Sequence, residues 1–167
     1  MRCGATFIVQ DYKGMDRYEA DERGESVPPL DPISDSKRFS EEIDSALMVE
    51  DLGFDSIWTI EHHVMPYAMV TNPIQLLSYF AAATKRIDVG TMVTVLPWHH
   101  PLRVAEDMIM LQQLLNGRTP YIGVGRGAGR REFSQLGIDM NESRQRFIES
   151  VEIIKKALTE EKFSYDG

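Results

Sequence analysis

Segments with the composition of β-strands alternate with segments of helical period along most of this chain. The strand segments are residues 5–9, 56–60, 87–95 and 121–124, each rich in β-branched or aromatic side chains. Apolar side chains recur at helical spacing in stretches that follow them. Because a helix that joins two strands makes them parallel neighbours, this alternation predicts an α/β fold with four βα units around a parallel sheet.

Several of the expected helices have recognisable starts. Pro73 and Pro101 each suit the first turn of a helix, and Ser40 suits an N-cap because two glutamates follow it. A fourth helix is expected over residues 141–158. By contrast, residues 11–37 are polar and rich in Gly, Pro and Asp. They are predicted to form a long loop without a helix.

Composition narrows the classes of function. The 167 residues suffice for one domain, residues 1–167, and 26 acidic against 18 basic side chains give a net charge of −8. Such a balance disfavours nucleic acid as a partner. A single cysteine, Cys3, and the lack of any long apolar stretch predict a cytoplasmic protein with no membrane partner.

Polar side chains follow the second strand segment, where Glu61, His62 and His63 stand together. Reactive groups of parallel α/β folds gather at the carboxyl ends of strands. An imidazole there can transfer protons near neutral pH, and Glu61 beside the pair can tune its pKa. The alternative is a surface turn with hydrogen-bonded histidines. His99 and His100 form a second adjacent pair, but neither pair has the spacing of metal ligands on a helix, so no metal site is expected.

A glycine-rich stretch, residues 123–129, follows the fourth strand segment and contains Arg126. Exposed backbone N–H groups and a guanidinium are suited to phosphate oxygens, so this stretch is a candidate phosphate site. The alternative is a tight turn that simply requires glycine. A dinucleotide fingerprint is a poor match, because the residues that follow do not begin a long helix.

Taken in order, several short strings resemble the bacterial luciferase-like flavin-dependent monooxygenase family. The resemblance extends from the first strand segment to the start of the last helix. The strings are Gly53-Phe54-Asp55-Ser56-Ile57-Trp58, Glu61-His62-His63, Val89-Gly90-Thr91, Leu96-Pro97, His100-Pro101, Glu106-Asp107, Asn116-Gly117-Arg118 and Gly125-Arg126-Gly127.

This resemblance implies a TIM barrel that binds reduced FMN, usually supplied by a separate flavin reductase, and uses O2 to oxygenate a small organic substrate. His62 matches the family's catalytic histidine, and Arg126 matches the arginine that holds the FMN phosphate. Met92 and Val93 match a strand bulge, often a non-proline cis peptide, that supports the flavin ring.

The expected cofactor-binding set also includes Gly125, Gly127 and Glu61. Gly125 stands where luciferase itself carries a reactive cysteine, so light emission is not expected. Four βα units are half of a complete barrel, which takes ~250 residues. The resemblance therefore implies either a missing carboxyl-terminal half or a partner, as a homodimer or heterodimer.

Two other functions stay open at this point. One is hydride transfer with a reduced deazaflavin, catalysed on the same barrel. The other is a flavin-binding or partner subunit that performs no chemistry. Oxygen consumption separates the first from a monooxygenase, and turnover without a partner subunit excludes the second.

Overall fold

Four parallel strands form one sheet in a computed structural model that describes residues 1–27, 29, 32–66 and 68–167. The sheet order is β1-β2-β3-β4, so each strand pairs with the next one along the chain. This confirms the α/β fold and the four βα units. The strands are β1 (Gly4–Phe7), β2 (Ser56–Thr59), β3 (Asp88–Val95) and β4 (Pro120–Gly125).

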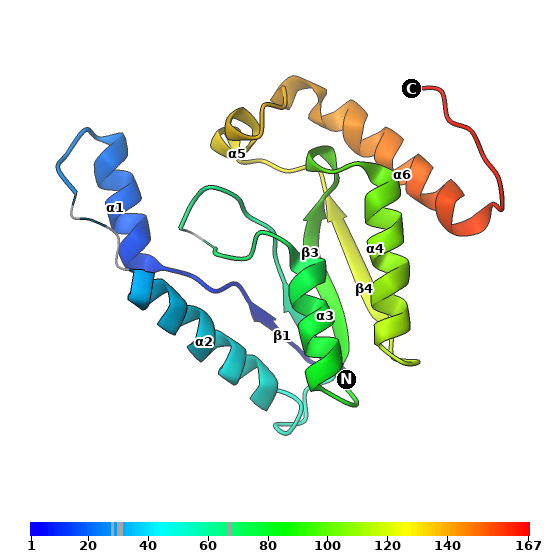
Figure 1. Cartoon of the computed structure of the whole chain (residues 1–167), viewed down its shortest axis with the longest axis horizontal. Coiled ribbons are helices and arrows are strands. Elements are labelled where there is room, and N and C mark those ends of the chain that lie inside the picture. The colour runs from blue at the N-terminus through cyan, green and yellow to red at the C-terminus, as the bar shows by residue number, and fades with distance from the viewer. Residues whose placement is uncertain (28, 30–31, 67) are drawn as a thin grey trace.

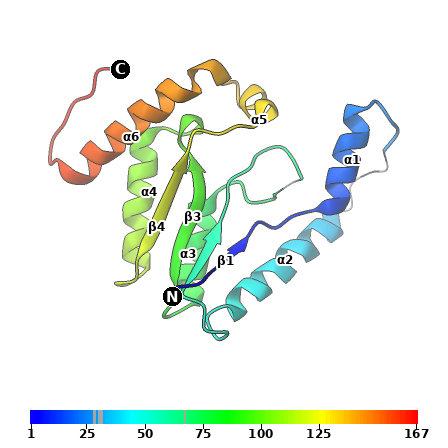
Figure 2. The same ribbon diagram turned by 180° about the vertical axis from the view of Figure 1, so that it is seen from behind.

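Helices cover one face of the sheet, as Figure 1 shows, whereas in the view from behind the strands lie in front of the helices (Figure 2). None of the helices among the described residues is both long and apolar enough to cross a membrane. The helices are α1 (Tyr12–Glu22), α2 (Pro32–Met48), α3 (Pro73–Ala83), α4 (Pro101–Leu114), α5 (Arg130–Gln135) and α6 (Ser143–Thr159), with short 3-10 turns η1 (Leu96–Trp98) and η2 (Met140–Glu142).

The predicted starts of α3 and α4 are confirmed. The Asn72 side chain accepts a hydrogen bond from the Gln75 N–H at 3.0 Å, one residue before Pro73 begins α3. α4 begins at Pro101, after His100 as its N-cap. The apolar faces of these two helices pack on the sheet and form one core with the outward side chains of β2 and β3. Its most buried members include Ile57, Leu77, Phe80, Val89 and Leu111.

The predicted loop over residues 11–37 is wrong. Helix α1 lies within it, and α2 begins at Pro32 instead of Ser40. The Asp11 side chain caps α1 by accepting from the Lys13 N–H at 3.1 Å. Gly14 is the one fully buried residue of α1, so the helix has no apolar stripe to recognise. Residues 28 and 30–31 of the predicted loop lie outside the described residues.

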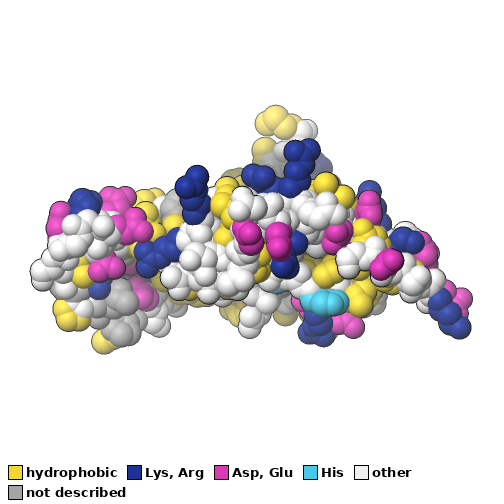
Figure 3. Space-filling model, turned by 90° about the horizontal axis from the view of Figure 1, so that it is seen from above, with side chains coloured by type: hydrophobic (Ala, Val, Ile, Leu, Met, Phe, Trp, Pro, Cys, Tyr) yellow, Lys and Arg dark blue, Asp and Glu magenta, His cyan; other side chains and the backbone are white. Residues whose placement is uncertain are grey.

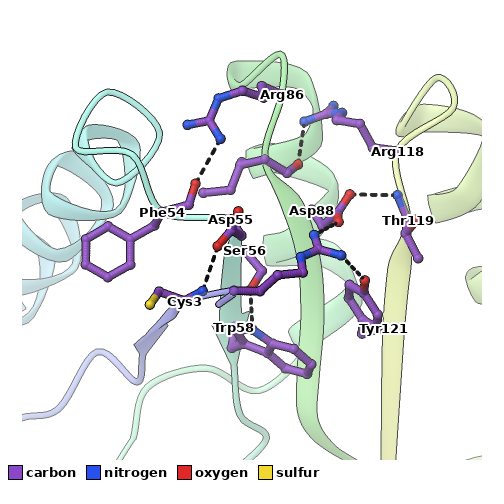
Figure 4. A network of polar contacts seen from close by, with 12 residues as sticks. Cys3, Phe54, Asp55, Ser56, Trp58, Arg86, Asp88, Arg118, Thr119 and Tyr121 are labelled. Atoms are coloured by element: carbon purple, nitrogen blue, oxygen red, sulfur yellow. Dashed lines mark hydrogen bonds and ion pairs between the residues drawn. The ribbon is translucent and has the colours of Figure 1, made fainter.

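A set of polar contacts joins the elements at the amino ends of the strands (Figure 4). The Arg118 guanidinium donates to three backbone carbonyl oxygens and to the Thr84 hydroxyl. Asp88 accepts from the Thr119 N–H at 2.9 Å and pairs with Arg2. In parallel barrels this end of the sheet contributes stability, while chemistry is carried by the opposite end.

Trp58 lies on the sheet face opposite the core and stacks on Tyr121, with ring centroids 5.7 Å apart. Glycines on both neighbouring strands make room for its indole ring. A Cβ at Gly90 would lie 2.4 Å from the ring, and one at Gly4 would lie 2.6 Å from Nε1. The indole therefore extends across three strands on the open face of the sheet.

Candidate active site

The carboxyl ends of β3 and β4 and the segments that follow β2, β3 and β4 meet at one end of the sheet, which we call the rim: residues 61–63, 92–99 and 125–132. Figure 3 views the molecule from this end, where charged, apolar and histidine side chains are interspersed. Hydrogen bonds link the three segments: Glu61 binds the backbone of Val95, and His62 binds Glu132. The predicted gathering of these segments is confirmed, because parallel strands bring their carboxyl ends to one edge.

Glu61 is the centre of a buried polar cluster. Its side chain is fully buried, and Oε1 accepts from His63 Nε2 at 2.9 Å and from His99 Nε2 at 2.5 Å. Oε2 accepts from the Val95 N–H at 2.7 Å. The rings of His63 and Trp98 meet nearly at right angles, with centroids 5.2 Å apart. Among the described residues, no group of His, Cys, Asp and Glu has an arrangement suited to a metal ion.

Glu61 and His99 shift each other's pKa in opposite directions. Burial alone would raise the pKa of Glu61, but hydrogen bonds from His63, His99 and the Val95 N–H hold it below its ordinary value. The hydrogen bond to Glu61 raises the pKa of His99, against the effect of its own burial. The cluster therefore favours a carboxylate beside a protonated imidazole.

These shifts predict how the Glu61→Gln substitution acts at different pH. Glu61 stabilises the fold above its ordinary pKa of 4.5 and loses that contribution as the pH falls through its lowered folded value. His99 stabilises the fold below 6.5 and loses that contribution as the pH rises through its raised folded value. The stability lost in Glu61→Gln should therefore be greatest between about pH 4.5 and 6.5.

Urea unfolding of both chains across this pH range measures the difference. Glu106→Gln, at an exposed carboxylate paired with Arg103, is the matched control and should show a small, nearly constant difference. A Glu61→Gln difference that stays the same at every pH would contradict the assignment of charge to the cluster.

His62 binds a second buried carboxylate, not Glu61. His62 Nδ1 and the His63 N–H both contact Glu132 Oε1, at 3.0 and 2.8 Å. The Glu132 side chain is 2% exposed and that of His62 is 29% exposed. Glu61 thus meets the His62–His63 pair at His63, and it also bonds His99. Gly129 makes the approach possible, because a Cβ there would lie 1.9 Å from Glu132 Oε2.

The peptide bond between Met92 and Val93 is cis, as the resemblance implied, and the pairing of β3 with β4 shifts register between Thr91 and Thr94. The Met92 side chain is half-exposed. Val93 points toward β4, where a Cβ on Gly125 would lie 2.4 Å from Val93 Cγ2. Gly125 therefore lets the fourth strand pack closely on the bulge.

Arg126 follows β4 directly and is exposed. Its guanidinium makes no hydrogen bond or ion pair within the described part of the chain, so its donors can bind an anion. Gly127 has a φ of +79°, a backbone conformation that favours glycine. The turn over residues 126–129 then leads into α5, which is only six residues long.

Two residues of the site, Glu132 and His99, carry almost no signal in the sequence that separates them from surface residues. Glu132 belongs to the charged run Arg130-Arg131-Glu132, which is typical of a solvated helix start. His99 is adjacent to His100, and only the fold shows that His99 turns toward Glu61 while His100 caps α4. A glycine three residues before Glu132 was the one local hint of close packing.

Known proteins resemble this chain in sequence and in structure. The chain is 39% identical over 111 residues, 66% of its length, to the alkanal monooxygenase alpha chain of Photorhabdus laumondii, and spans 31% of that protein. All of it superposes on 46% of monooxygenase RslO1 from Streptomyces bottropensis, with a TM-score of 0.80 and 27% identity. It likewise covers 41% of the oxygenating constituent of 3,6-diketocamphane monooxygenase from Pseudomonas putida, solved with FMN, with a TM-score of 0.77 and 27% identity.

The chain spans about a third of the length of the curated relatives it matches. Its four βα units correspond to under half of the solved proteins, which agrees with half of a TIM-type barrel. A sequence profile of the luciferase-like monooxygenases matches residues 18–167. The chain therefore belongs to the luciferase-like monooxygenase family.

Proposed function

We propose that this chain supplies the amino-terminal, FMN-binding half of a flavin-dependent monooxygenase that oxygenates a small organic substrate with O2. One observation carries the proposal. Three features lie at the carboxyl ends of three neighbouring strands and share the rim: a histidine held by a buried carboxylate, a half-exposed bulge and an exposed arginine. Family membership and the FMN in the Pseudomonas putida structure support the choice of cofactor.

The rim residues fit FMN by their chemistry. Arg126 offers guanidinium donors with no competing partner in the described chain, which suits a phosphate. The Met92-Val93 bulge presents a half-exposed apolar side chain, which suits an aromatic ring system. Gly125 and Gly127 act here by packing the strand and turn against β3, so the phosphate would be held by Arg126 and by backbone N–H groups.

Reduced FMN, when bound, supplies the electrons that activate O2. The protein's own contribution is to bind, orient and move protons. Glu132 contacts His62 Nδ1 and so holds in place the imidazole that would exchange a proton with a bound molecule. Glu61 lies too deep to touch a ligand and instead holds His63 and the end of β3 in place. The turnover step we assign to His62 is proton transfer at the rim.

The proposal implies partners. A flavin reductase would supply the reduced FMN, and a further four βα units, from the same polypeptide or a second subunit, would complete the barrel around the open face of the sheet. Exposed Cys3 suits the reducing conditions of the cytoplasm, where such a reductase would act.

Replacing Arg126 by alanine should weaken the binding of reduced FMN by roughly 10- to 100-fold, because hydrogen bonds to a charged group are lost. The measurement is an anaerobic titration of the 167-residue chain with reduced FMN, followed by flavin absorbance. Arg38→Ala, which removes an exposed arginine from α2, is the matched control and should bind as the unsubstituted chain does.

Equal affinities of the unsubstituted chain and Arg126→Ala would overturn the phosphate assignment. Exposure of the FMN-loaded protein to air then separates the alternatives. Oxygen consumption supports a monooxygenase, whereas binding of a reduced deazaflavin without oxygen consumption supports hydride transfer. Binding without any turnover in the assembled protein supports a flavin-binding subunit.

A further inference from the structure

Helices α1 and α5 lie far apart in the sequence, but the side chain of one α5 residue, Arg131, joins them. Its guanidinium carbon lies 4.3 Å from the centroid of the Tyr18 ring, and Nη1 donates to Glu22 Oε1 at 3.2 Å. Tyr18 also donates its hydroxyl to Glu22 Oε1, at 3.0 Å. We call these three side chains the α1 latch. The planar guanidinium of arginine suits both the ring and the carboxylate.

The rest of α1 is held loosely. At its start the Asp11 N–H donates to the Pro66 carbonyl oxygen at 3.2 Å, and Gly14 packs against Pro66. Beyond that turn, the helix is polar on most sides and buries no large apolar side chain. Between α1 and the segment 64–66 lies a cavity of about 470 Å³. That volume is within the range of small-molecule sites.

Arg131 is adjacent to Glu132, which binds His62 Nδ1 and the His63 N–H. The first turn of α5 therefore contacts α1 with one residue and the candidate catalytic histidine with the next. α5 is a short helix, and its buried Phe133 packs against Trp98 at the rim.

We propose that α1 is a movable cover over this cavity beside the rim, and that Arg131 is a positioning residue whose latch, when closed, sets the orientation of His62 through Glu132. Cation–π contacts and exposed ion pairs are weak, so the latch can break and reform without unfolding the chain. The identity of any molecule that enters the cavity rests on the proposed function, but the latch and its link to His62 do not.

The test measures both ends of the link in the 167-residue chain without flavin. In Arg131→Ala, hydrogen exchange of the α1 amides should be about 3- to 10-fold faster, because one cation–π contact and one ion pair are lost. The ¹⁵N resonances of the His62 imidazole should shift in the same variant. Tyr18→Leu, which leaves α5 untouched, should reproduce both changes to a smaller degree.

Two control variants distinguish a specific link between α1 and His62 from a general loss of stability. Arg130→Ala removes an exposed neighbour of the latch and should change neither measurement. Glu132→Gln should shift the His62 resonances and leave α1 exchange as it was. Unchanged α1 exchange in Arg131→Ala would overturn the latch, and faster exchange with an unshifted His62 would overturn the coupling. Loss of FMN binding would leave both results intact, so failure of the proposed function is a separate outcome.

Discussion

Replacement of Glu61 by alanine is expected to lower the free energy of unfolding by about 3–5 kcal/mol. The carboxylate is fully buried and is the shared acceptor for His63, His99 and the Val95 N–H. Its removal takes from His99 the carboxylate that favours its protonated form, and leaves an unpaired backbone N–H in the interior. Equilibrium unfolding in urea at pH 6, monitored by far-UV circular dichroism, measures the loss.

Two further substitutions show which part of Glu61 matters. Glu61→Gln keeps an acceptor oxygen for the backbone and should cost less than Glu61→Ala. Glu106→Ala removes an exposed carboxylate from α4 and should change stability by about 1 kcal/mol or less. If Glu61→Ala were as mild as Glu106→Ala, the cluster would not be holding the rim together.

Replacement of Gly125 by alanine is expected to damage the rim although it adds only one methyl group. The added methyl would lie 2.4 Å from Val93 Cγ2, and a β-branched side chain cannot turn away easily. We expect a loss of about 1–3 kcal/mol in stability, typical of overpacking, together with weaker binding of reduced FMN. Urea unfolding and the anaerobic titration measure the two effects.

A double substitution tests the cause. Val93→Ala removes the methyl groups that the new side chain would meet, so Gly125→Ala with Val93→Ala should recover much of the stability that Gly125→Ala alone loses. Strictly additive losses would show that Val93 is not the obstacle. In that case the backbone of β4, and not the Val93 side chain, would be what requires glycine at position 125.

The parts of the fold that could be predicted are those where local signals and tertiary packing agree. Pro73 and Pro101 begin helices whose apolar faces pack on the sheet, so the same residues that start each helix also bury it. Helix α1 could not be predicted, because it buries only Gly14 and depends on the Asp11 cap and on a contact with Pro66. A polar sequence with no stripe is typical of a loop as much as of such a helix.

At the candidate site, the residues that lie at the rim could be predicted. Which of their side chains bond to one another could not. The strand ends identify His62 and Arg126, since each directly follows a strand at the same edge of the sheet. Which carboxylate binds His62 depends on the path of the turn at residues 126–129, which carries Glu132 toward β2. Glu61 is only one residue from His62 in sequence, yet the turn of the backbone sends it to the other side.

The chain's two tryptophans lie in different parts of the structure. Trp98 meets His63 and Phe133 at the rim, whereas Trp58 stacks on Tyr121 over the open face of the sheet. The fluorescence of each tryptophan therefore reports on a different part of the structure. In Trp58→Phe the remaining emission comes from Trp98 and reports on the rim around His63 and Phe133. In Trp98→Phe it comes from Trp58 and reports on the open face of the sheet. Binding at the rim and binding on the open face could thereby be followed as two separate events in real time.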